Sequence, residues 1–241
     1  MIFNIIYSEG TTQMKIITLV CVLVAVILAL SLHEFAHAFV AHKCGDDTAK
    51  NNGRMTMNPI KHIDPFGFIM LMILGFGFAK PVPINPYNFK KQRRDYFLVS
   101  VAGITVNFIL AVISSFLYVV FSVIARTLIL EALAVFFLYF LFINIGLMVF
   151  NLLPIFPLDG FRIVEAAFGR TNKFINFMRK YGQYILFGLL IWSVVLSWVI
   201  PYVPDAAANI LQYFDVLGFT LGFLINNISG GLVRLWSLIF F

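Results

Sequence analysis

One apolar run near the amino terminus constrains this chain more than any other feature. From residue 16 to residue 41 only five side chains are not apolar, and three of these, His33, Glu34 and His37, are ionisable. A helix rises 1.5 Å per residue, so a helix over this run would cross the roughly 30 Å hydrocarbon core of a bilayer. The run is too long for the apolar part of a signal peptide, and it therefore predicts a transmembrane helix.

The composition extends this interpretation to the whole chain. Of the 241 residues, 61% are hydrophobic and 12% are charged, whereas a soluble domain carries roughly 25% charged residues. Further apolar runs cover residues 96–125, 132–153, 184–200 and 216–241, the last of them interrupted by two asparagines and two glycines. We expect an all-α integral membrane protein, a polytopic bundle of about 4–6 transmembrane helices in one membrane-embedded domain over residues 1–241.

A shorter apolar segment lies between the first and second spans. Residues 66–79 contain Gly67, Gly75 and Gly77, and a proline-rich stretch follows to residue 86. This segment is too short to span comfortably, and irregular backbone at membrane depth needs protein or a water-filled cavity around it. We therefore expect a re-entrant hairpin or loop over residues 66–86.

The basic residues predict the orientation. Nine of the 17 Lys and Arg residues lie in residues 43–95 and five lie in residues 154–181, which leaves three for the rest of the chain. Such grouping is typical of cytoplasmic loops under the positive-inside rule. The net charge of +6 is explained by these two loops, so we expect a lipid bilayer and no nucleic acid as partner. Two cysteines do not indicate a disulfide framework.

The polar residues of the first span form the pattern His33-Glu34-Phe35-Ala36-His37. Positions i and i+4 lie on one face of a helix, so both imidazoles can bind one zinc ion. Glu34 can then act as general base toward an activated water. Ionisable groups inside a transmembrane helix are costly and usually functional. The alternative is a polar cluster that bonds neighbouring helices.

A catalytic zinc ion usually has three protein ligands, and Asp159 is the candidate for the third. It lies in the stretch Asn151-Leu-Leu-Pro-Ile-Phe-Pro-Leu-Asp159-Gly160, where prolines end the third span. The alternative role for Asp159 is to cap a short helix that begins near residue 161. Asn107 would be a costly amide in mid-helix without a partner, and either substrate binding or an interhelical hydrogen bond explains it.

Several motifs together resemble the site-2 protease family of intramembrane metalloproteases, peptidase family M50, in its short bacterial form without a PDZ or regulatory domain. They are HEFAH at 33–37, NPIKHIDPFG at 58–67, AKPVPINP at 79–86, RRD at 93–95, AGITVN at 102–107 and NLLPIFPLDG at 151–160. Members often have Gly-Pro where this chain has Gly103-Ile104, which leaves the local helix geometry open.

The resemblance implies zinc bound by His33, His37 and Asp159, Glu34 as catalytic base, and Asn151 as a group that stabilises the oxyanion. It also implies that the hairpin at 66–86 guides a membrane-spanning peptide substrate. We therefore expect an intramembrane zinc metalloprotease of a bacterial cytoplasmic membrane, with residues 43–95 and 154–181 on the cytoplasmic side. The alternative is a non-proteolytic metal transporter or metal-binding protein, whose ligands would be spread along a path rather than gathered at one point.

Overall fold

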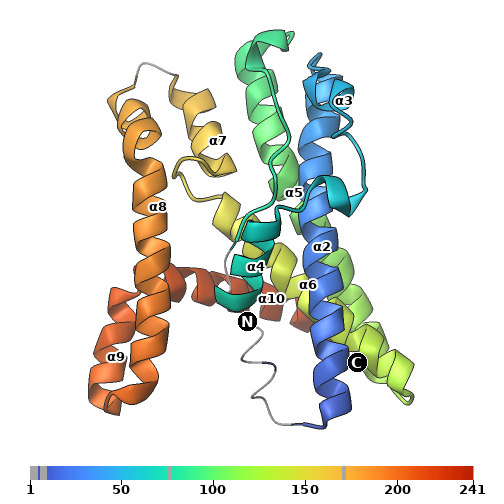
Figure 1. Ribbon diagram of the computed structural model, residues 1–241. Helices are drawn as coiled ribbons and strands as arrows, with labels where there is room; N and C mark the ends of the chain where they lie inside the picture. The colour runs from blue at the N-terminus through green and yellow to red at the C-terminus, as the bar shows by residue number, and fades with distance from the viewer. Residues whose placement is uncertain (1–4, 6–9, 75–76, 170–171, 241) are drawn as a thin grey trace.

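A computed structural model of the chain describes residues 5, 10–74, 77–169 and 172–240. Helices dominate these residues, and no β-strand occurs among them (Figure 1). Five helices are apolar and long enough to cross a bilayer: α2 (Thr12–Lys43), α5 (Gln92–Ile124), α6 (Leu128–Asn151), α8 (Lys173–Val199) and α10 (Val216–Phe240). The predicted fold class, an all-α polytopic membrane protein, is confirmed.

Four shorter helices accompany these five among the described residues. They are α3 (Thr48–Asn51), α4 (Pro65–Leu74), α7 (Asp159–Phe168) and α9 (Asp205–Phe214), with single 3-10 turns at Pro59–Lys61, Pro86–Asn88 and Ile200–Tyr202. In Figure 1, α3 and α7 lie at one end of the bundle and α9 lies at the opposite end. The two basic stretches of the sequence therefore meet at one end, although residues 170–171 lie outside the described residues.

Polar caps make the helices longer than the apolar runs. The Thr127 side chain accepts a hydrogen bond from the backbone N–H of Leu130 (3.4 Å), so α6 begins at Leu128 rather than near residue 132. Asn172 likewise accepts from the N–H of Phe174 (2.8 Å), and α8 begins at Lys173, within the basic stretch. A cap satisfies an N–H group that the first turn leaves without a partner, which is why it sets the helix start.

Helices α2, α5 and α6 pack more extensively on one another than any other helices among the described residues. Ala25 and Ala29 of α2 pack against Phe140 of α6, and such small side chains let membrane helices approach closely. Helix α10 crosses α5 and α6 as one continuous helix (Figure 1). Its Trp236 Nε1 donates to Ser115 Oγ on α5 (2.9 Å). The ambiguous run at 216–241 is thus a single helix over its described part, with residue 241 outside it.

The segment that joins α2 to α5 returns into the bundle. Helix α4 reaches toward the middle of the bundle from the end that carries α3 (Figure 1), and its Met72 packs on Val22 and Val26 of α2. Residues 77–85 then run back without helical structure, and the N–H of Val82 reaches the first span. Helix α4 and this return occupy the range 66–86 for which a re-entrant hairpin or loop was predicted, and residues 75–76 lie outside the described residues.

Candidate metal centre

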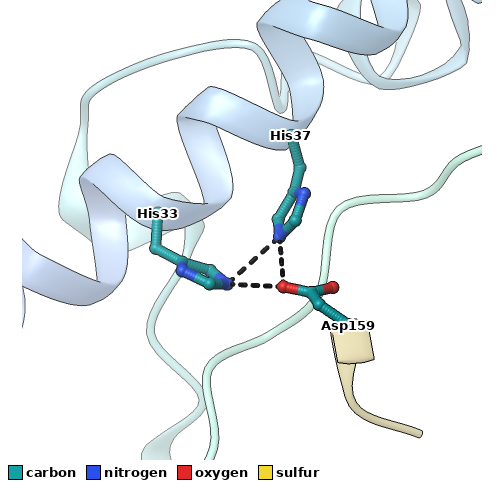
Figure 2. Close-up of side chains that lie close together, drawn as sticks. All are labelled: His33, His37 and Asp159. Atoms are coloured by element: carbon teal, nitrogen blue, oxygen red, sulfur yellow. Dashed lines mark hydrogen bonds and ion pairs between the residues drawn. The ribbon is translucent and has the colours of Figure 1, made fainter. Parts of the chain in front are cut away.

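His33 and His37 lie one turn apart on the inner face of α2. Both side chains are buried, and their Nε2 atoms are 3.1 Å apart (Figure 2). This pairing follows from the helix itself, because side chains four residues apart lie on the same face. The same geometry places Glu34 on a neighbouring part of the helix surface, where it is partly buried.

Asp159 approaches the two histidines from the start of α7. Its Oδ2 atom lies 3.3 Å from His33 Nε2 and 3.0 Å from His37 Nε2 (Figure 2). The N-cap residue of α7 is Leu158, and no side chain there makes a capping hydrogen bond, so Asp159 does not serve as the cap. Gly160 allows the tight return from α6, since a Cβ atom there would lie 2.3 Å from the backbone oxygen of Leu152.

The hydrogen bonds of the two imidazoles determine which lone pairs face the carboxylate. His37 Nδ1 donates to the backbone oxygen of Val99 (2.7 Å), and His33 Nδ1 donates to the amide oxygen of Asn107 (2.5 Å). In a neutral imidazole the other nitrogen is then an acceptor, so both Nε2 lone pairs point at the Asp159 carboxylate.

Three electron pairs thus converge at one point, and Asp159 Oδ2 is buried without a hydrogen-bond donor. Such an arrangement calls for a cation between the three atoms. Ligand atoms bound to a tetrahedral zinc ion at about 2.0–2.1 Å are separated by roughly 3.3 Å, close to the separations observed here. Among the residues that the structure describes, this is the one group of three or more side chains suited to hold a metal ion.

Helix α5 closes the site through a glycine. A Cβ atom at Gly103 would lie 2.4 Å from Cε1 of His33 and 2.6 Å from Nε2 of His37. Only a residue without a side chain lets the α5 backbone come this close to both rings. The isoleucine after it, where a proline often follows in the family that the sequence resembles, leaves α5 helical from Gln92 to Ile124.

Glu34 and the metal-ligand group line one cavity of about 370 Å³. The Oε2 atom of Glu34 accepts a hydrogen bond from the backbone N–H of Val82 (2.8 Å). The return segment 77–85 therefore holds the Glu34 carboxylate beside the ligands. The opposite wall comes from α8, and its members are Gln183, Leu186, Phe187 and Leu190. The cavity combines an apolar lining with a few polar groups, as substrate sites usually do.

Asn151 and Arg162 also line this cavity. Asn151 Nδ2 donates to the backbone oxygen of Leu147 (3.0 Å), which uses one of its two amide protons. Arg162 Nη1 lies 3.6 Å from Asp159 Oδ1, the carboxylate oxygen that faces away from the histidines.

Asn107 does not reach the cavity. It is fully buried between α2 and α6, where it bonds His33 and also Asn144 (2.8 Å). Of the other histidines, His62 is buried in the loop before α4 and bonds the backbone oxygen of Thr56 (2.7 Å), while His42 pairs with Asp47. Neither is part of the group around Asp159.

Contributors to the site that were not predicted include the backbone oxygen of Val99, the N–H of Val82, the bare α-carbon of Gly103, and the side chains of Asn144 and Arg162. The first two are backbone groups, and no residue type marks them in a sequence. Asn144 did carry a signal, because it is an amide in the middle of the apolar run 132–153. By the argument that singled out Asn107, it needed a buried partner as well.

Known proteins resemble this chain in sequence. The family model described as peptidase family M50 matches residues 123–193, which contain Asn151 and Asp159. A Bacillus subtilis protein named "Putative zinc metalloprotease YwhC" is 41% identical over 200 residues, covering 80% of this chain and 90% of the relative. A Mycolicibacterium smegmatis protein named "Putative zinc metalloprotease Rip2" is 29% identical over 217 residues, covering 88% and 78%. No solved structure gives a significant match.

Proposed function

Because this chain belongs to peptidase family M50, we propose that His33, His37 and Asp159 hold the zinc ion of an intramembrane metalloprotease. The enzyme class and its metal follow from the family, and the apolar helices make it a multi-pass membrane protein. The observation that carries the assignment of these residues is the convergence of three electron pairs within 3.3 Å in a buried site without a donor.

In this assignment each polar group of the cavity has one role. His33, His37 and Asp159 would hold the zinc ion, which would supply the Lewis acidity that makes a water molecule nucleophilic near neutral pH. Glu34, which the Val82 N–H holds in place, takes the proton of the attacking water and passes it to the leaving amine. The second amide proton of Asn151 stabilises the negative charge on the substrate carbonyl oxygen. Arg162 holds Asp159 from its far side.

The substrate in this proposal is a membrane-spanning peptide. The cavity is lined mainly by apolar side chains of α2, α6 and α8, which are helices that can cross a bilayer. A non-proteolytic metal transporter would need further ligands along a path, whereas the described residues gather them at one point beside a carboxylate suited to be a base.

The test of this proposal separates metal binding from chemistry. Glu34→Gln keeps the size of the side chain and removes the base, so it should retain zinc and lose about 100- to 10,000-fold in cleavage of a transmembrane reporter peptide. His33→Ala and Asp159→Ala should lose the zinc itself. Full cleavage by Glu34→Gln, or unchanged zinc binding by either ligand variant, would overturn the assignment.

We also propose that the end of the bundle with α3 and α7 faces the cytoplasm of a bacterial cell membrane. That end carries the basic stretches 43–95 and 154–181, whereas residues 201–215 at the other end contain two aspartates and no Lys or Arg. A membrane-impermeant thiol reagent should label Asn52→Cys only after permeabilisation and Asp205→Cys in intact cells. The reverse labelling pattern would contradict this orientation.

A further inference from the structure

A chain of buried amides runs from the metal centre across α5 into α6. His33 Nδ1 donates to Asn107 Oδ1 (2.5 Å), Asn107 Nδ2 donates to Asn144 Oδ1 (2.8 Å), and Asn144 Nδ2 donates to the backbone oxygen of Phe140 (2.8 Å). Asn107 and Asn144 have no exposed surface. Water therefore cannot substitute for any partner in this chain.

The backbone oxygen of Phe140 determines the donor-to-acceptor direction of these hydrogen bonds. The Phe140 oxygen is a backbone carbonyl, which can only accept a hydrogen bond. Asn144 must therefore turn its NH₂ group toward Phe140 and its oxygen toward Asn107. Asn107 must in turn offer NH₂ to Asn144, which leaves its own oxygen for His33. The Phe140 carbonyl on α6 therefore determines, through the orientation of two amides, that an oxygen atom faces the imidazole of His33 on α2.

His37 shows the same outcome by a shorter route. Its Nδ1 donates directly to the backbone oxygen of Val99 (2.7 Å), so one carbonyl fixes which ring nitrogen carries the proton. His33 has an amide in that place, and an amide can rotate to present NH₂ instead of oxygen. With NH₂ toward Nδ1, the proton of His33 would move to Nε2, and Nε2 could no longer bind a metal ion.

We infer that Asn144 is a positioning residue for the zinc site: by orienting Asn107, it fixes the His33 tautomer whose Nε2 can bind zinc. This inference rests on the proposed role of His33 as a ligand. Groups that orient metal ligands commonly change metal affinity by 10- to 100-fold when they are removed. Asn144 lies two hydrogen bonds from His33, on a helix that supplies no ligand to the ion.

Two substitutions of Asn144 interrupt this series of hydrogen bonds. Asn144→Leu keeps the branched shape of the side chain and removes both hydrogen bonds. Asn144→Ser is the milder variant, because a serine hydroxyl can donate to the carbonyl four residues earlier, as Ser100 does to Tyr96, yet it is too short to orient Asn107. In both variants Asn107 is free to rotate. We expect the zinc dissociation constant of the purified full-length protein, measured by competition with a chromophoric chelator, to rise about tenfold or more.

A second substitution distinguishes positioning from packing. Asn107→Asp places a carboxylate beside His33, and a carboxylate accepts from Nδ1 in either orientation. Combined with Asn144→Ser or Asn144→Leu, it should restore zinc affinity to within a few-fold of the unaltered protein. Ser114→Ala is the matched control on α5, since the Ser114 hydroxyl donates to Leu110 within its own helix, and it should leave zinc affinity unchanged.

The outcomes separate this inference from the proposed ligand set. Unchanged zinc affinity in both Asn144 variants would overturn the inference, and so would a loss that Asn107→Asp does not restore, because that loss would come from helix packing. In either case His33→Ala still tests the ligand role independently. Unchanged zinc affinity in His33→Ala would overturn the ligand set and the inference together.

Discussion

The packed half of the molecule, helices α2, α5, α6 and α7, buries polar side chains, whereas the peripheral arm, helices α8 and α9, buries none. Among the described residues, each helix of the packed half buries at least one histidine, asparagine, serine or carboxylate side chain. The buried residues of α8 are Ile175, Gly182, Leu186, Leu190 and Leu196, and α9 buries no residue. Large apolar side chains such as Trp198 and Ile191 are instead exposed on α8, as suits contact with lipid.

The difference shows how a membrane protein fixes a reactive site. A polar group in an apolar interior must find a partner, and each partner restricts how two helices can sit relative to each other. All three proposed ligands and Glu34 belong to the packed half, whereas α8 contributes one wall of the cavity, mainly through apolar side chains. We therefore expect substitutions in the packed half to change metal binding and those on the outer face of the arm to have little effect.

The largest effect that this comparison predicts comes from one methyl group in the packed half. In Gly103→Ala the new Cβ atom would lie 2.4 Å from His33 and 2.6 Å from His37, so the rings or α5 must move. A displacement of this kind should weaken zinc binding by about 100-fold, at the upper end for residues that orient ligands, and abolish measurable cleavage. The measurement is a zinc titration against a chelator, with helical content by circular dichroism as the control for folding. Zinc affinity equal to that of the unaltered protein would refute the packing of α5 on the histidines.

The sequence predicts the ligands because their geometry is local or chemically required. His33 and His37 meet through the helix repeat, and a zinc site with two histidines needs a third ligand, which points to Asp159. The contributions of Gly103 and Val82 depend on which helix and which loop pack against α2. That arrangement is part of the tertiary structure. A run that is apolar on every face of its helix does not indicate which face packs on which neighbour.

The same limit applies to the fold. Apolar length predicts the spans, but Thr127 and Asn172 set where α6 and α8 begin, beyond the apolar runs. The continuity of α10 through Asn226, Asn227, Gly230 and Gly231 was not predicted from the sequence. Within a helix these residues lose little when neighbouring helices and the backbone ladder satisfy them, and α10 packs on both α5 and α6.

A middle-sized effect is expected at Asp46, which ties the packed half to the segment that holds Glu34. Asp46 follows α2, and its buried carboxylate accepts from the N–H of Asn85 (2.7 Å) and from Asn88 Nδ2 (2.8 Å). Hydrogen bonds to a charged group contribute about 1.5–3 kcal/mol each, so Asp46→Asn should lower the unfolding temperature and reduce kcat/KM several-fold. Asp47→Asn, at the exposed neighbour, is the control and should change neither quantity appreciably.

The pH dependence of unfolding tests the same carboxylate. Burial alone would raise the pKa of Asp46, but hydrogen bonds from Thr48, Asn85 and Asn88 outweigh it and hold the pKa below its ordinary value. The ionised group therefore stabilises the folded protein above that ordinary value, about 3.9, and the contribution is lost as the pH falls toward the folded-state pKa. The difference in unfolding temperature between the unaltered protein and Asp46→Asn should shrink from pH 7 to pH 3. A constant difference would show that charge at this position is not what joins the segments.

The smallest effect is expected from the same glycine-to-alanine change on the peripheral arm. Gly188 lies on the exposed side of α8, and a Cβ atom there would meet no atom within 4 Å. Because the new methyl group meets no neighbour, Gly188→Ala should leave zinc affinity and cleavage unchanged. Alanine is the better helix former by about 0.8–1.0 kcal/mol in water, so the stability of the protein should be equal or slightly raised. Zinc titration and thermal unfolding of Gly188→Ala and Gly103→Ala side by side compare the effect of the same substitution in the peripheral arm and in the packed half. A marked loss of zinc affinity in Gly188→Ala would mean that the outer face of α8 is held against the metal centre as firmly as α5 is, and the distinction between the packed half and the arm would fail.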